Sequence, residues 1–142
     1  MNSKNDCFKT ILVICFGFFL VSCQLGIPMS EGTKWLDSKN DKPEISIAGA
    51  WTAEEWGTAI FKQEGKNITG MLGDYPVKGV VSGTSIYLLM YNKDRVEYFA
   101  ELKASDDKTL KGSYTKCTSL DQFKADSSYT RSMSIIFVSP LR

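Results

Sequence analysis

From residue 45 onwards the chain alternates between short runs of β-branched or aromatic residues and clusters of Gly, Asn and Asp. This texture is typical of β-strands joined by turns. No stretch of ten or more residues keeps the 3.6-residue apolar period of an amphipathic helix. The pattern therefore predicts about eight strands, over residues 45–52, 56–63, 68–72, 77–82, 85–91, 95–103, 109–115 and 129–139.

The two faces of a strand are clearest over residues 95–103, where charged and apolar positions alternate and Phe99 is the apolar exception on the charged face. Most connections are short, which makes neighbouring strands antiparallel, because parallel pairs need long crossovers. A meander with one wet and one dry face buries the dry side most simply by curling on itself. We therefore predict an all-β domain, a small antiparallel up-and-down β-barrel of about eight strands. The alternative is a two-sheet β-sandwich built from the same strands.

Residues 24–44 are polar and have no sustained period, which predicts a tether that holds the barrel off the membrane. Trp35-Leu36 is the exception, and we expect these two residues to pack back on the domain. The predicted organisation is a signal peptide over residues 1–22, a modified N-terminus and tether over residues 23–44, and a barrel over residues 45–142.

The first 22 residues have the parts of a secretory signal, namely Lys4 and Lys9 followed by an apolar segment over residues 11–21. That segment is too short to span a bilayer, which needs roughly 20 residues. It ends in Leu20-Val21-Ser22-Cys23, which resembles the lipobox of bacterial lipoproteins. The alternatives are an ordinary cleaved signal with a chance cysteine and a short anchor helix that stays in place.

The resemblance to lipoproteins implies cleavage before Cys23 and lipidation of its thiol, so that the bilayer is the first partner of the protein. Two or more acyl chains anchor a protein stably, whereas one holds it marginally. Since Gln24 is not aspartate, the same resemblance favours the outer membrane over the inner one.

Charge and composition exclude several functions. The chain carries 17 basic and 16 acidic residues without basic runs, so it lacks the clustered positive charge that nucleic-acid binding requires. It contains no histidine, the usual general base near neutral pH and a common metal ligand, and it shows no recognisable nucleophile arrangement. We therefore expect neither an enzyme nor a cofactor or metal site.

Of the four cysteines, Cys7 and Cys15 lie in the signal and Cys23 would carry lipid, which leaves Cys117 without a disulfide partner.

Four short motifs in the first strands resemble the calycin class of small barrels, which includes lipocalins and avidins. They are Gly49-Ala50-Trp51, Trp56-Gly57 with Phe61 and Gln63, Ile68-Thr69-Gly70, and Val77-Lys78-Gly79. The resemblance implies that Trp51 plugs one end of the barrel and that a lumen could hold a hydrophobic ligand. No ligand-contacting residue can be carried over, because the chain is shorter than a lipocalin and its three tryptophans all lie early.

Two functions remain, a module that binds a small apolar ligand in the barrel and an interaction or envelope-structural protein with a packed barrel. Interior volume separates them, since large inward side chains would fill the barrel whereas Gly79 and Gly112 would leave room. Tyrosines could also line a lumen mouth, with hydroxyls that orient a ligand. The candidate mouth aromatics are Tyr87, Tyr91, Tyr98, Phe99 and Tyr114. The candidate filling residues are Phe61, Leu88 or Tyr87, Tyr98, Leu102, Tyr114, and Ile135 or Ile136.

Overall fold

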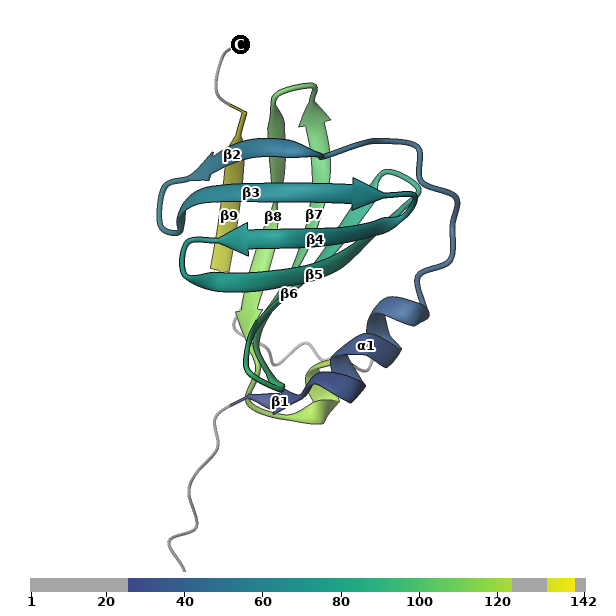
Figure 1. Ribbon diagram of the computed structural model, residues 1–142, viewed down its shortest axis with the longest axis vertical. Coiled ribbons are helices and arrows are strands. Elements are labelled where there is room, and N and C mark those ends of the chain that lie inside the picture. Colours follow the sequence, from purple (N-terminus) through teal and green to yellow (C-terminus); the bar gives the residue numbers. More distant parts are fainter. Residues whose placement is uncertain (1–25, 124–132, 140–142) are drawn as a thin grey trace, which may run out of the picture.

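The computed structural model describes residues 26–123 and 133–139, and these form a closed antiparallel barrel (Figure 1). Each strand from β2 to β9 pairs with the next one along the chain, and β9 also pairs with β2, which closes the ring of eight strands. This confirms the predicted barrel, and a two-sheet sandwich is wrong. The strands are β2 (Gly49–Ala53), β3 (Gly57–Glu64), β4 (Asn67–Leu72), β5 (Tyr75–Ser82), β6 (Ser85–Asn92), β7 (Arg95–Asp106), β8 (Thr109–Lys116) and β9 (Met133–Val138).

Alternate positions of these strands fill the barrel with buried apolar side chains. Phe61 of β3 and Phe137 of β9 meet edge to face with their ring centroids 5.9 Å apart. Of the paired alternatives, Leu88 and Ile135 are buried in the core, whereas Ile136 is 49% exposed. The other core residues are Ile47, Trp51, Ala53, Ala59, Ile68, Leu72, Val77, Val81, Ile86, Met90, Ala100, Leu102, Leu110 and Tyr114.

Gly79 and Gly112 do not create lumen space, contrary to the expectation that they would leave room. A Cβ atom added to Gly112 would lie 1.9 Å from the Glu101 carbonyl oxygen on β7. One added to Gly79 would lie 2.7 Å from Leu88 Cδ2 on β6. Both glycines therefore permit close approach of neighbouring strands, as expected where a sheet bends sharply.

The segment predicted to be a tether forms structure from residue 26 onwards, which corrects the sequence-based expectation for that part of it. Strand β1 (Ile27–Pro28) pairs with the start of β7, and helix α1 (Met29–Asp37) follows directly. The helix lies outside the barrel, at the bottom of Figure 1, against β6 and β7. In the described ranges, 26–123 and 133–139, no helix is long and apolar enough to span a membrane.

Helix α1 is held by an outer cluster of buried side chains, and Trp35-Leu36 packs back on the domain as predicted. Trp35 is 8% exposed, and its ring meets Tyr87 and Phe99 edge to face, each with a centroid distance of 5.5 Å. This contact explains the apolar exception at Phe99, which lies on the outer face that the helix covers. The buried members of the outer cluster are Ile27, Trp35, Leu36, Val80, Leu89, Val96 and Cys117.

Val96 belongs to this outer cluster although the alternation over residues 95–103 places it inside. The pairing of β6 with β7 shifts between Met90↔Tyr98 and Tyr91↔Val96, so that Glu97 is an extra residue on β7. Such a bulge exchanges the faces on either side of it. Val96 therefore points outwards and packs beneath α1.

Candidate functional site

One end of the barrel is closed by the segment that leads into β2. The side chain of Gln63 holds this segment, because its Oε1 accepts a hydrogen bond from Ile47 N at 2.8 Å and its Nε2 donates to Ile45 O at 3.1 Å. Trp51 is 6% exposed, and its Nε1 donates to Ile47 O at 2.8 Å. Trp51 thus lies in the core directly beneath this crossing segment, and its role as a plug stays a prediction.

A half-open groove of about 480 Å³ lies at this end, which we call the Trp51 groove. Its deepest residues are the buried Ile47, Trp51 and Leu110, and the β7–β8 turn with Asp106 and Asp107 forms part of its rim. A hydrogen bond from Lys108 N to Asp106 Oδ1 (2.8 Å) lowers the pKa of the Asp106 carboxyl. The groove is apolar at its floor and acidic at this rim. Its remaining lining residues are Ile45, Ser46, Thr84, Ala104 and Ser105.

The opposite end carries four aromatic rings, which we call the aromatic end. Trp56 lies at the centre, and its ring meets those of Tyr75, Tyr98 and Tyr114 edge to face at centroid distances of 5.7, 5.0 and 5.1 Å. Tyr114 is buried, whereas Trp56, Tyr75 and Tyr98 are half-buried. The rings come from the β2–β3 turn and from strands β5, β7 and β8.

Two carboxylates hold the hydroxyls of this cluster. Tyr75 Oη donates to Glu97 Oε2 at 3.0 Å, and Tyr114 Oη donates to Glu55 Oε2 at 2.9 Å. Burial and the neighbouring Glu55 carboxylate raise the pKa of Tyr114. Trp56 Nε1 is buried and makes no hydrogen bond to a described residue. The Trp56 side chain lowers the pKa of Tyr114, but by less than burial and Glu55 together raise it. The rings pack against one another, so the aromatic end is a filled cluster rather than an open mouth.

The pKa of Tyr75 is raised to about 12, first by burial and then by the hydrogen bond and the negative charge of Glu97. A phenol with a higher pKa in the folded than in the unfolded chain stabilises the fold below its ordinary pKa of 10.0, and this contribution is lost as pH rises towards about 12. We therefore expect the Tyr75→Phe variant to lose less stability over this pH range than the unmodified protein. Urea unfolding at several pH values measures the difference.

The Glu97→Gln variant is the control for this prediction. It removes the negative charge but keeps the tyrosine, so the pKa of Tyr75 should fall part of the way back, as followed by phenolate absorbance. An unchanged Tyr75 titration in Glu97→Gln, or a loss of stability with pH in Tyr75→Phe equal to that of the unmodified protein, would contradict the Tyr75–Glu97 pairing.

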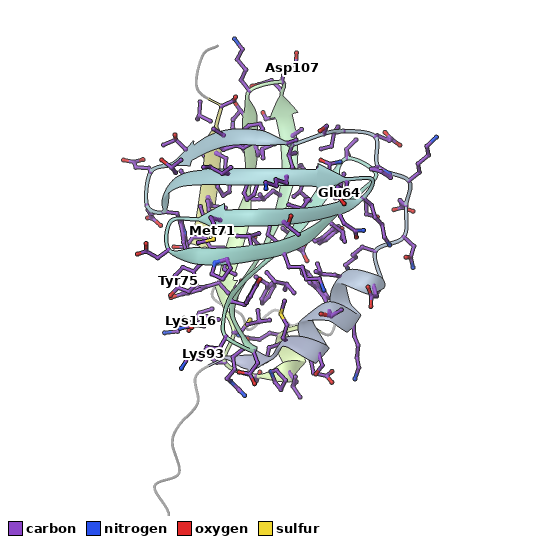
Figure 2. The ribbon with its side chains drawn as sticks, in the orientation of Figure 1. Glu64, Met71, Tyr75, Lys93, Asp107 and Lys116 are labelled. Carbon is purple, nitrogen blue, oxygen red and sulfur yellow. The ribbon has the colours of Figure 1, made fainter. Side chains whose placement is uncertain are left out.

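A third feature is a strip of apolar side chains on the outer wall, away from α1, which we call the apolar strip. Ile60 on β3 pairs with Met71 on one side and Ala50 on the other, and Val138 on β9 pairs with Thr52. Ile60 is 55% exposed. Single apolar residues are common on protein surfaces, but Ile60 has exposed apolar neighbours, and such a group needs an explanation. Figure 2 shows Met71 on the outer wall of β4. The strip comprises the apolar residues Ala50, Ile60, Met71, Ile136 and Val138, with Thr52 beside Val138.

Four of the five predicted mouth aromatics separate into two groups, and Tyr91, half-buried near the end of β6, belongs to neither. Tyr98 and Tyr114 lie at the aromatic end, whereas Tyr87 and Phe99 lie in the outer cluster beneath α1. Sequence reasoning missed Trp56 and Tyr75 as members of the aromatic end, because turns far apart in the chain bring them together.

Cys117 is buried, and burial raises the pKa of its thiol to about 12. The predicted signal peptide, the lipobox and Cys23 lie outside the described residues.

Within the described part of the chain, no group of three or more Cys, Asp or Glu side chains is placed to hold a metal ion. Comparison of the chain with protein-family models, with curated proteins and with solved structures gave no match. The proposals below therefore depend on the residues and geometry of this chain alone.

Proposed function

We propose that the protein is a lipoprotein of the bacterial envelope, anchored in the outer membrane through lipidated Cys23, whose barrel acts through its surface as a non-enzymatic interaction module. The Leu20-Val21-Ser22-Cys23 motif supports the anchor. The packed interior supports the mode of action, and it is the observation that carries the proposal.

Interior packing favours a surface function over a lumen ligand. Inward positions hold large buried side chains such as Phe61, Leu88 and Phe137. At Gly79 and Gly112, where room was expected, the neighbouring strand occupies the space. A lipocalin-like ligand would need these side chains to move out of a close-packed core, which is costly.

The apolar strip is the part of the wall best suited to a protein partner. Its large members are 43–55% exposed. Ile60 and Met71 lie on the adjacent strands β3 and β4, and Ile136 and Val138 lie on β9, with β2 between β3 and β9. Contiguous apolar surface of this kind marks interaction sites. A photo-crosslinking residue at position 60 of the full-length protein, expressed in cells, should therefore yield a discrete crosslinked product.

The matched control places the same crosslinker at Lys103, an exposed residue on β7 away from the strip. We expect no product there. Products of equal intensity at both positions, or none at position 60, would count against the strip as an interface.

Membrane fractionation of the Cys23→Ala variant tests the anchor separately, because unchanged partitioning into detergent would contradict lipidation.

The Trp51 groove favours a second candidate function, binding of a small apolar molecule at the barrel end. Its volume of about 480 Å³ lies within the usual range for ligand pockets, roughly 300–1,000 Å³. An apolar dye should then bind a soluble form that begins at residue 24, and Ile45→Asp in the groove wall should weaken the binding. Ile60→Asp on the strip is the control, and equal dye uptake by all three proteins would exclude the groove.

A further inference from the structure

The chain is fixed to the barrel from residue 26 onwards. The Arg95 guanidinium donates to the Gly26 carbonyl oxygen, Ile27 pairs with Val96, and Met29 N donates to Asp94 O at 2.8 Å. Ile27 is 3% exposed. The attachment point of the preceding chain is therefore a defined place on the surface, beside the start of β7.

Cys23 is three residues before Gly26, with Gln24 and Leu25 between them. An extended chain covers at most about 3.6 Å per residue, so the two Cα atoms lie within about 11 Å of each other. If Cys23 is lipidated, as proposed above, this length leaves the domain little freedom to move away from the bilayer. A tether reaching to residue 44 would have allowed free tumbling.

The aromatic end is next to this attachment point. Gly26 lies against the Val96 carbonyl, to which a Cβ atom added at Gly26 would approach within 2.5 Å. The following residue, Glu97, accepts the hydrogen bond of Tyr75. Figure 2 shows Tyr75, Lys93 and Lys116 on this side of the molecule, with Asp107 at the far end.

The chemistry of this end suits a membrane interface. Trp56, Tyr75 and Tyr98 are half-buried rings with polar atoms, the side chains that settle at the headgroup level. Leu120, on the short helix η2 (Leu120–Phe123) that contacts α1, is 47% exposed. The exposed charges around them are Lys93 and Lys116 against Glu54, Glu55, Asp74 and Asp94. Acidic side chains outnumber basic ones, so the acyl chains of Cys23, rather than attraction to anionic headgroups, would hold this end on the bilayer.

We propose that the aromatic end is the membrane-facing surface of the protein, held on the bilayer by the acyl chains of Cys23. The Trp51 groove and the β7–β8 turn with Asp107 then point away from the membrane. This orientation rests on the proposed lipidation, and it leaves the apolar strip on the side wall accessible to a partner.

Two turn residues of the same type allow a matched test. Asp74 lies beside Tyr75 at the aromatic end, Asp107 lies in the β7–β8 turn, and both are exposed. The full-length lipidated protein, carrying a fluorophore on Asp74→Cys or on Asp107→Cys, is reconstituted into vesicles of phosphatidylethanolamine and phosphatidylglycerol with a quencher on the headgroups. We expect quenching several-fold stronger at position 74 than at position 107.

Equal quenching at the two positions, or stronger quenching at position 107, would overturn the orientation. Inserting a flexible Gly/Ser segment between Leu25 and Gly26 should remove the difference, and a difference that survives the insertion would also contradict the short-link argument. Co-sedimentation with the vesicles separates the two proposals. Labelled protein that sediments but is quenched equally refutes the orientation alone, whereas protein that does not sediment refutes the anchor and the orientation with it.

Discussion

Replacing Phe137 with alanine should destabilise the barrel by about 3–5 kcal/mol, the usual cost of removing a buried phenylalanine ring. Phe137 is fully buried and packs edge to face on Phe61. It also lies where the ring of strands has the fewest pairs among the described residues, because β9 and β2 pair there through Thr52↔Val138 and Ala53↔Phe137. A cavity there should therefore loosen barrel closure. For a domain of this size each kcal/mol shifts the melting temperature by roughly 4–8 °C, measurable by circular dichroism.

Ile136 provides the control from the adjacent position on the same strand. Its side chain is 49% exposed, so Ile136→Ala should change stability by no more than about 0.5 kcal/mol. Equal destabilisation by the two substitutions would mean that β9 does not present Phe137 to the core as described.

Trp35→Ala should have the second large effect, by releasing α1 from the outer wall. The ring is buried against Tyr87 and Phe99, and its loss should cost about 3–5 kcal/mol. Cys117 belongs to the same outer cluster, and its thiol, with a pKa of about 12, should react very slowly in the unmodified protein at pH 8. In the variant we expect faster reaction with a thiol reagent while the far-ultraviolet spectrum of the barrel is retained.

The neighbouring Lys34→Ala substitution is the matched control, since Lys34 points to solvent with 72% of its side chain exposed. Its thiol reaction rate should equal that of the unmodified protein. If Trp35→Ala left both the rate and the melting temperature unchanged, the docking of α1 would be refuted.

The strands were predictable because a two-residue period and short turns are local properties of the sequence. The alternation over residues 95–103 identified β7, and the Gly83-Thr84 connection separated β5 from β6. The bulge at Glu97 was not predictable, because it depends on the pairing with β6, and it moved Val96 to the outer face. The start of β2 was placed four residues early, since Ile45 and Ile47 bind the side chain of Gln63 on β3 instead of its backbone.

Helix α1 escaped prediction because its stability comes from tertiary contacts rather than from a long apolar period. Its buried face consists of Gly32, Trp35 and Leu36. Because glycine is not counted as a hydrophobic residue, this face showed too few apolar positions to predict a helix. Gly32 is required by packing, since a Cβ atom there would lie 2.8 Å from both Leu89 Cδ1 and Val96 Cγ2. The aromatic end could not be predicted from the sequence either. Trp56 and Tyr98 are 42 positions apart in the numbering, and the closed barrel brings them into contact.

Native mass spectrometry of the protein extracted from its own envelope tests the central claim most directly. A packed barrel anchored at Cys23 predicts a chain whose mass is that of the sequence from Cys23 onwards plus acyl groups, with no small molecule held inside the barrel. A small molecule retained in constant proportion under native conditions by both the unmodified protein and the groove variant Ile45→Asp, and lost on unfolding, would contradict the packed interior. An unmodified cysteine would contradict the anchor.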